Sequence, residues 1–489
     1  MTSIAQKSAV RRDPPCGPVE GAAQGGVANF LGIPFAEPPV AGLRFLAPRP
    51  KAPWSGVRIC TSYGHTAPQP DRDFTLIPEP EEPGDDYLNL NVFAPAEIPG
   101  KPLPVMVYFH GGGYFSGCNR SPWFEGATFV RNGVIVVSPS YRLNVEGFMP
   151  VEGAPLNRAL LDWIAALEWV RDNIGAFGGD PTKVTIAGQS AGAGAVATLM
   201  AAPLARGLFH RAVLFSGSVG FGGSIGRAQA FGERFGKAVG RPLTVEALAS
   251  LSRAELIAGY EKASPDPAAR RPGEGFVLNI RHGLPLQPLA GTDNLPKPPA
   301  QAFAEGASAD IPALLTTTQD EFVFEFEPLG ASVNDSYLSE VLELFELDEA
   351  AVRALYPTYG NARLLGQVAT DLLMRAPMTR MAEIRRVAGA APTWTAEFRR
   401  PSPVSLASPL RAAHCLDMPF YFDKLRLSSA MKVCGADAPQ ALADQMHRSI
   451  AEFVKGRMPD WPSWNEARAT RLWDWPEVTT TRDLAGALA

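Results

Sequence analysis

The segment Val184–Ala193 places the strongest constraint on how this chain can fold. It is an apolar run rich in β-branched residues, followed by Gly188-Gln189-Ser190-Ala191-Gly192 and then by further small residues. This order predicts a strand, a very tight turn and a helix. Glycine on both sides of the turn removes the Cβ atoms that would clash if the serine adopts a strained backbone. A serine at a helix N-terminus faces free N–H groups, so Ser190 is the candidate nucleophile.

Strand-like and helix-like segments alternate on both sides of this turn. Nearly continuous apolar runs, as expected for buried parallel strands, occur at 103–109 and 133–138. Apolar residues at helical spacing predict a crossover helix over 157–174. Further strands are expected at 88–93, 212–215, 311–315 and 391–398, and an amphipathic helix at 438–455. The alternation predicts an α/β fold with a large, mostly parallel central sheet and helices on both faces.

We expect one domain over residues 1–489, since α/β enzymes built on one large sheet often reach this length. Residues 1–15 are expected to be a disordered lead-in. Short apolar runs between turns in the region 20–60 predict a small N-terminal antiparallel sheet. Helical insertions that shape a pocket are expected at about 220–310 and 325–390.

Composition excludes several classes of function. The net charge is −5 and no basic block occurs, so nucleic acid is not an expected partner. No apolar run reaches the roughly 18–20 residues that span a bilayer. The five cysteines are scattered without a C-x-x-C pair, which argues against structural zinc or a disulfide framework. A cytoplasmic location is therefore expected, with a secreted form that has lost its signal as the alternative. No metal or cofactor is implied.

A glycine-rich turn follows the expected strand at 103–109. Three consecutive glycines after His110 let the backbone pass close to a ligand and aim its N–H groups at it. The amides of this turn, joined by the N–H of Ala191, predict an oxyanion hole. The motif that cradles phosphate, G-x-x-x-x-G-K-[ST], does not occur.

The general base must be chosen from six histidines. With this turn the triad order is serine, acid, histidine, and His210 lies too soon after Ser190 to be the base. His447 falls on what we expect to be the solvated side of a helix. His414 lies in a short loop entering an aromatic run, and His282 lies in an inserted region. The residues alone favour His414 and leave His282 as an alternative.

The acid is less well defined by the residues alone. Glu321 and Asp320 lie together just after the apolar run 311–315, where a strand is expected to end. Either carboxylate is compatible with a role in a triad, and a simple solvated turn is equally compatible.

The chain as a whole resembles the type-B carboxylesterase family, which includes the bacterial para-nitrobenzyl esterases and, more distantly, the cholinesterases. The resemblance covers roughly residues 15–475. The stretches that carry it include FLGIPFAEPPVAGLRF (30–45), YLNLNVFAP (87–95), VYFHGGGYFSG (107–117), SYRLNVEGF (140–148), TTQDEF (317–322) and HCLDMPFYFD (414–423), besides the serine turn.

The resemblance implies the α/β-hydrolase fold and a set of roles. The family's nucleophile, acid and base match Ser190, Glu321 and His414. The remaining matches are the oxyanion donors Gly112, Gly113 and Ala191, a supporting serine at Ser216, and Gln189 at the position of the family's usual glutamate.

Departures from the family pattern bear on the substrate. Ala67 and Tyr87 stand where many eukaryotic members form a disulfide. The segment 72–77 lacks the tryptophan with which cholinesterases stack on a quaternary ammonium, and Gln189 removes a negative charge. These differences imply a neutral substrate. Phe322 stands where the family has a glycine after the acid.

We therefore expect a serine carboxylic-ester hydrolase acting on neutral small-to-medium esters, with the ester and water as its partners and a monomeric or homodimeric state. A specialised hydrolase of a xenobiotic, drug or mycotoxin ester or amide is the main alternative. A lipase would need an apolar lid, and a non-catalytic relative would usually lack a triad residue. Four aromatic residues are candidates to line the pocket, although a core position is as plausible for half of them: Tyr114, Phe322, Phe324 and Phe420.

Overall fold

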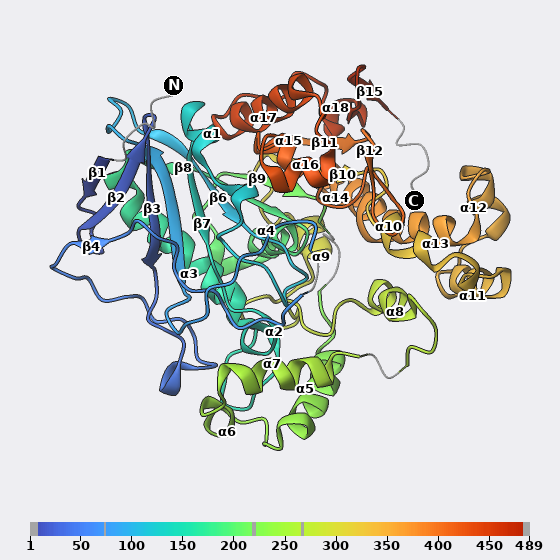
Figure 1. The fold of residues 1–489 in the computed structure, drawn as a ribbon, viewed down its shortest axis with the longest axis horizontal. Helices are drawn as coiled ribbons and strands as arrows, with labels where there is room; N and C mark the ends of the chain where they lie inside the picture. Colours follow the sequence, from blue (N-terminus) through green and yellow to red (C-terminus); the bar gives the residue numbers. More distant parts are fainter. Residues whose placement is uncertain (1–7, 73–74, 218–221, 266–267, 483–489) are drawn as a thin grey trace.

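The computed structural model describes residues 8–72, 75–217, 222–265 and 268–482 (Figure 1). Within these residues a single large sheet contains thirteen strands. Its central part is a run of parallel strands in the order β7-β6-β8-β9-β10-β11-β14. Their bounds are β7 (Ile135–Pro139), β6 (Leu103–Phe109), β8 (Gly179–Gln189), β9 (Arg211–Phe215), β10 (Ala313–Thr318), β11 (Thr393–Phe398) and β14 (Thr470–Trp473).

Antiparallel strands extend both edges of this sheet. On one side lie β5 (Asn89–Pro95), β3 (Val27–Pro34), β2 (Val19–Gln24) and β1 (Ser8–Arg12), with the short β4 (Arg58–Ile59) beside β2. On the other side β15 (Thr479–Thr481) pairs with β14. A separate two-stranded sheet joins β12 (Ser402–Ser405) and β13 (Pro409–Arg411). The predicted large, mostly parallel sheet is confirmed, and the N-terminal antiparallel strands are continuous with it.

The expectation of a disordered lead-in is wrong for residues 8–12. These residues form β1, which pairs with β2 from Ser8↔Ala23 to Arg12↔Val19. The Arg12 guanidinium also donates to the carbonyls of Pro95 and Ala96 at 3.2 and 2.8 Å. A mostly polar edge strand of this kind is stabilised by backbone pairing rather than by an apolar pattern, so its sequence gives little signal. Residues 1–7 lie outside the described part of the chain.

Side chains of the central strands alternate between two cores, one on each face of the sheet. In β6, Val105, Val107 and Phe109 belong to one core, whereas Met106 and Tyr108 belong to the other. The first core contains the crossover helix α3 (Arg158–Asn173) and α4 (Ala191–Ala201). The second contains α1 (Ala127–Arg131), α15 (Met418–Tyr421), α16 (Ser428–Cys434) and α17 (Gln440–Val454). Both faces of the sheet are thus covered by helices, as the sequence predicts.

Two groups of helices interrupt the alternation of strand and helix. Between β9 and β10 lie α5 (Ile225–Val239), α6 (Val245–Ala249), α7 (Arg253–Ala263), α8 (Glu274–His282) and α9 (Pro299–Ala304). Between β10 and β11 lie α10 (Val323–Phe326), α11 (Asp335–Leu344), α12 (Glu349–Leu355), α13 (Asn361–Thr370) and α14 (Ala376–Val387). In Figure 1, α5 to α7 project below the sheet and α11 to α13 project to one side. The inserted regions at about 220–310 and 325–390 are therefore helical.

A buried ion pair fixes the loop between β7 and α3. Arg142 and Asp162 lie 2.6 Å apart, with side chains 1% and 0% exposed. The same carboxylate accepts the backbone N–H of Arg142 at 3.0 Å. The short helix α2 (Asn144–Phe148) begins two residues later, and Asn144 donates through its backbone N–H to the carbonyl of Tyr114 at 2.8 Å. The pair thus supports the glycine-rich turn that precedes Tyr114.

Candidate active site

Ser190 occupies the turn between β8 and α4 in the strained conformation that its glycine neighbours predict. Its φ and ψ are 58° and −121°. A Cβ added to Gly188 would lie 2.3 Å from the carbonyl oxygen of Gly192, and one added to Gly192 would lie 2.1 Å from the carbonyl oxygen of Phe109. The Ser190 N–H donates to the carbonyl of Phe215 in β9 at 2.8 Å. The close approach of strand and helix therefore requires both glycines.

The glycine-rich turn after β6 lies against Ser190. A Cβ placed on Gly111 would be 3.1 Å from the Cβ of Ser190. Gly112 and Gly113 have φ values of 105° and 61°, a region that favours glycine. Among the described residues, no acceptor pairs with the N–H groups of Gly112, Gly113 or Ala191. Three unpaired amides near one serine form a suitable environment for a developing oxyanion.

His414 and Glu321 come together from segments far apart in the sequence. The Nδ1 atom of His414 lies 2.6 Å from Oε2 of Glu321, whose side chain is fully buried. The other carboxylate oxygen, Oε1, accepts the backbone N–H of Thr318 at 2.7 Å. The His414 backbone N–H also donates to the Glu321 carbonyl at 3.0 Å. These contacts hold the ring with Nδ1 towards the acid and leave Nε2 as the reactive nitrogen.

Nε2 of His414 is paired with Gln189, the residue before the candidate nucleophile. The side-chain Nε2 of Gln189 lies 3.1 Å from Nε2 of His414 and 3.0 Å from Sγ of Cys415. Within the described ranges, the Ser190 hydroxyl makes no hydrogen bond to the ring. Gln189, rather than Ser190, is therefore the hydrogen-bond partner of Nε2. In this structure Ser190, His414 and Glu321 do not form a continuous series of hydrogen bonds.

Burial and neighbouring groups have opposite effects on the protonation of His414. Burial lowers its pKa, but the Cys415 sulfur and the Glu321 carboxylate both favour the imidazolium. The net result is a pKa well above the usual 6.5. Burial also raises the pKa of the Cys415 thiol. A strongly basic imidazole next to a carboxylate is suited to accept a proton from a hydroxyl group.

Asp320, His110 and His447 make other contacts. The Asp320 carboxylate accepts the N–H of Ala412 at 3.4 Å, and burial raises its pKa. His110 is buried, stacks on Tyr141 and has its pKa lowered to about 4 by burial. The prediction that His447 is solvated is wrong. Its ring is buried against Phe129, and its Nδ1 pairs with the Tyr421 carbonyl at 2.8 Å.

Ser216 occupies the end of β9, next to the strand that carries Ser190. Its side chain is fully buried and its φ is 47°. Its backbone N–H donates to the Thr316 carbonyl in β10 at 2.8 Å. No hydrogen bond to its hydroxyl is formed by any residue that the structure describes. Its place at the ends of adjacent strands is compatible with the supporting role that the family resemblance implies.

Of the four aromatic residues expected to line a pocket, Phe322 contacts the candidate base. Its ring centroid is 5.0 Å from that of His414. Phe324 is partly buried against the second core. Tyr114 packs on Phe148 in the first core. The prediction for Phe420 is wrong, because this ring is fully buried against Phe398 and has no surface to offer a substrate.

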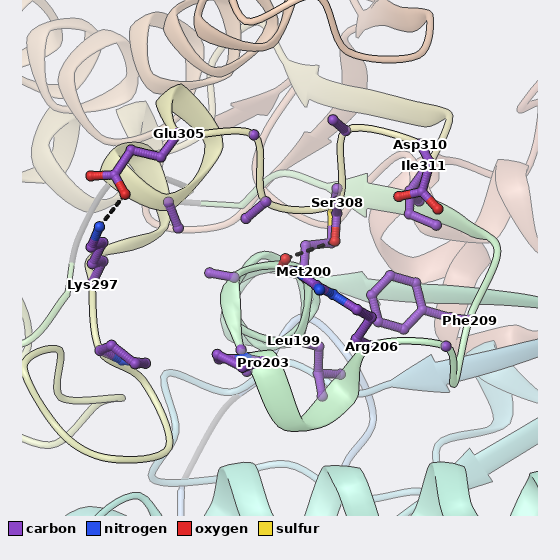
Figure 2. A pocket seen from close by; sticks show the side chains of 18 of the residues that line it. Leu199, Met200, Pro203, Arg206, Phe209, Lys297, Glu305, Ser308, Asp310 and Ile311 are labelled. Carbon is purple, nitrogen blue, oxygen red and sulfur yellow. Dashed lines mark hydrogen bonds and ion pairs between the residues drawn. The ribbon is translucent and has the colours of Figure 1, made fainter.

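A cavity of about 700 Å³ lies away from this site, at the opposite end of α4 (Figure 2). Its lining includes Leu199 and Met200 from that helix, and the Met200 carbonyl accepts a hydrogen bond from Ser308 at 2.7 Å. Lys297 and Glu305 pair at its edge. Because an eleven-residue helix spans about 16 Å, this cavity does not reach Ser190.

Cys415 is the contact that sequence reasoning missed. It follows the candidate base directly and has a φ of 74°, a strained value for a residue with a side chain. This conformation directs its sulfur to Gln189. The number and spacing of cysteines indicate only whether disulfides or metal sites are expected. They give no sign of a contact between Cys415 and Gln189. Among the described residues, no cluster of His, Cys, Asp and Glu side chains is suited to hold a metal ion.

Comparisons with known proteins identify the family of this chain. A sequence profile of the carboxylesterase family matches residues 9–485. The para-nitrobenzyl esterase of Bacillus subtilis (strain 168) is 34% identical over 500 residues, covering 96% of this chain and 95% of that protein. Phenmedipham hydrolase of Pseudarthrobacter oxydans is 32% identical, with 91% of each chain covered.

Solved structures of similar proteins have the same fold. A PNB esterase structure superposes with a TM-score of 0.83 at 31% identity, covering 97% of each chain. A carboxylesterase of Geobacillus stearothermophilus gives a TM-score of 0.82 at 30% identity, covering 98% of each chain.

The parallel sheet with a serine turn at its centre defines an α/β-hydrolase. The chain belongs to the carboxylesterase family, and it is a carboxylic ester hydrolase.

Proposed function

We propose that Ser190, His414 and Glu321 form the catalytic triad of this esterase. The observation that supports it most directly is the buried pairing of His414 Nδ1 with Glu321 Oε2 at 2.6 Å, close to three unpaired amides beside Ser190. Nε2 accepts the Ser190 proton as Oγ attacks the ester carbonyl, and Glu321 stabilises the imidazolium. The amides of Gly112, Gly113 and Ala191 stabilise the oxyanion.

The second half of the reaction uses the same groups. The imidazolium returns its proton to the departing alcohol, which leaves an acyl group on Ser190 Oγ. His414 then deprotonates water, which attacks the acyl carbonyl, and the carboxylic acid leaves as the proton returns to Ser190. For the first step, Ser190 must replace Gln189 as the partner of Nε2. Such rearrangement is common, because catalytic hydrogen bonds in free enzymes are often long and tighten only with substrate.

The catalytic groups can be tested by substitution and labelling. Ser190→Ala is expected to abolish turnover of 4-nitrophenyl acetate while the circular dichroism spectrum stays unchanged. A fluorophosphonate is expected to label Ser190 alone. His414→Ala should abolish turnover, whereas His282→Ala should not. Labelling at another serine, or activity lost only in His282→Ala, would overturn the assignment.

The main alternative is a specialised hydrolase of a xenobiotic, drug or mycotoxin ester or amide with the same triad. Two similar proteins carry the names phenmedipham hydrolase and fumonisin B1 esterase. Comparing 4-nitrophenyl acetate and butyrate with the matching anilides separates an esterase from an amidase. Comparable turnover of the anilides would favour the alternative. A monomeric or homodimeric state and a cytoplasmic location stay predictions.

A further inference from the structure

A second cavity, of about 310 Å³, opens on the glycine-rich turn of the proposed oxyanion hole. Gly113 and Phe115 form the end of the cavity nearest to the site, and helices α5, α7 and α8 form its walls. Its volume is in the range of small-ligand pockets. Gly113 belongs both to this lining and to the proposed oxyanion hole, so the pocket adjoins the place where an ester carbonyl would bind. We call it the Gly113 pocket.

The far walls of the Gly113 pocket carry two arginines. Arg227 and Arg234 both line it, and their seven-residue spacing places them on the same face of α5. Among the described residues that line the pocket there is no aspartate or glutamate. Leu284, Pro285 and Leu286 supply apolar surface beside the two guanidinium groups. The lining thus combines room for a short hydrocarbon chain with a cationic end.

Arg234 is the better placed of the two to bind a ligand. Its Nε donates to the Ala263 carbonyl at 3.0 Å and its Nη1 to the Ala230 carbonyl at 3.3 Å. In the described part of the chain, its Nη2 donates no hydrogen bond and no carboxylate lies within ion-pair distance. The two carbonyls fix the plane of the guanidinium, and a fixed, partly buried guanidinium is well suited to recognise a carboxylate.

Arg227 has a more structural setting. Its guanidinium donates to Asn279 Oδ1 at 3.2 Å and to the Leu278 carbonyl at 3.4 Å, which joins α5 to α8. Tyr260 closes another wall, and its ring stacks on Phe115 with centroids 6.1 Å apart.

We propose that the preferred substrates of this esterase carry a carboxylate, separated from the scissile ester by a short hydrocarbon chain, and that Arg234 binds it in the Gly113 pocket. This inference rests on the proposed ester-hydrolase site and specifies its substrate class. It departs from the neutral ester that the sequence predicts. That prediction was based only on the absence of groups that bind a cation. The sequence does not show that residues of α5 line the same pocket as Gly113.

The test compares matched esters that differ only in the terminal charge. Mono-4-nitrophenyl adipate and 4-nitrophenyl hexanoate place the carboxylate or a methyl group on the acyl side. The pair 3-acetoxybenzoate and 3-methylphenyl acetate does the same on the alcohol side. The wild-type enzyme is expected to show a kcat/KM at least about tenfold higher for the anionic member of one pair. The pair that shows the preference identifies which half of the ester occupies the pocket.

Variants separate a charge effect from a structural effect. Arg234→Gln is expected to remove the preference, mainly through a higher KM for the anionic ester, and to leave the neutral ester within about twofold. Arg234→Lys should retain part of the preference because it keeps the charge. Lys237→Gln removes the same charge from an exposed position of α5 and is expected to change neither substrate.

Equal turnover of charged and neutral esters by the wild type would overturn the inference, and so would equal losses for both esters in Arg234→Gln. The proposed function can fail separately. If Ser190→Ala still hydrolyses the neutral esters, the triad assignment is wrong whatever the charge preference. If Ser190→Ala is inactive and no charge preference exists, only the substrate class is wrong.

Discussion

At the scale of single residues, the environment of His414 determines how activity depends on pH. An imidazolium cannot accept the Ser190 proton, so kcat/KM falls as pH decreases through the His414 pKa. Since the cited influences raise this pKa above 6.5, the decline is expected to begin above that pH. The carboxylate of Glu321 contributes to the rise at a distance of 2.6 Å.

Replacing Glu321 with glutamine is therefore expected to have two effects. The maximal kcat/KM should fall by about 100-fold or more, because the amide no longer orients or stabilises the imidazolium. The acid limb of the pH–rate profile should move to lower pH, because a negative charge is lost. Both are measured with 4-nitrophenyl acetate from pH 5 to 9. Asp320→Asn is the matched control, and an equal loss in both variants would contradict the role of Glu321.

Gln189→Glu is expected to shift the acid limb in the opposite direction. The new carboxylate would lie near Nε2 of His414, which Gln189 now approaches to 3.1 Å. A negative charge at this distance favours the imidazolium by about one pKa unit or more. The pH–rate profile of the variant should therefore begin its decline at higher pH than that of the wild type. An unchanged acid limb would show that Gln189 is not next to the base in solution.

At the scale of elements, the packing of β6, β8 and α4 positions the catalytic groups. Gly192→Ala would place a Cβ 2.1 Å from the Phe109 carbonyl and 2.7 Å from the His110 carbonyl. Backbone atoms cannot yield as a flexible side chain does, so α4 must move away from β6. We expect a loss of about 2–3 kcal/mol in the free energy of unfolding and a large loss of activity. Gly100→Ala, whose Cβ would meet no heavy atom within 4 Å, should behave as the wild type in urea unfolding.

Elements with strong hydrophobic patterns are predictable from the sequence. The expected strand 103–109 matches β6, and the helix expected over 157–174 matches α3 within a residue at each end. The serine turn was identifiable because strand, glycines and helix occur together. The strand β1 and the buried position of His447 were not, because both depend on partners far along the chain. For the same reason, the residue pattern by itself left Glu321 and Asp320 as equal candidates. The family resemblance implied Glu321, and the fold shows that this carboxylate meets His414.

At the scale of the whole molecule, buried charges couple the sheet to its loops. Asp162→Ala would leave the Arg142 guanidinium buried without its partner, although other residues still accept hydrogen bonds from it. Removing one member of a buried pair typically costs about 3–5 kcal/mol. Urea unfolding should show a destabilisation of this size. Asp172→Ala removes an exposed carboxylate paired with Arg171, whose side chain is 51% exposed, and should change stability by less than about 0.5 kcal/mol. Similar values for both variants would contradict the importance of the buried pair.

The helices α5 to α9 leave the sheet at the end of β9 and return to it at β10, and these two strands are hydrogen-bonded neighbours from Ala212↔Ala313 to Phe215↔Thr316. The pairing of β9 with β10 holds the two ends of this inserted segment together, whichever residues the segment contains. Each doubling of the length of a flexible loop raises the entropic cost of closing it by only about 0.6 kcal/mol. A relative's equivalent segment joined between Ser216 and Ala313 is therefore expected to leave the catalytic strands in place. In such a molecule the sheet carries the groups proposed for the reaction, whereas the inserted helices, which line the Gly113 pocket, can change without it.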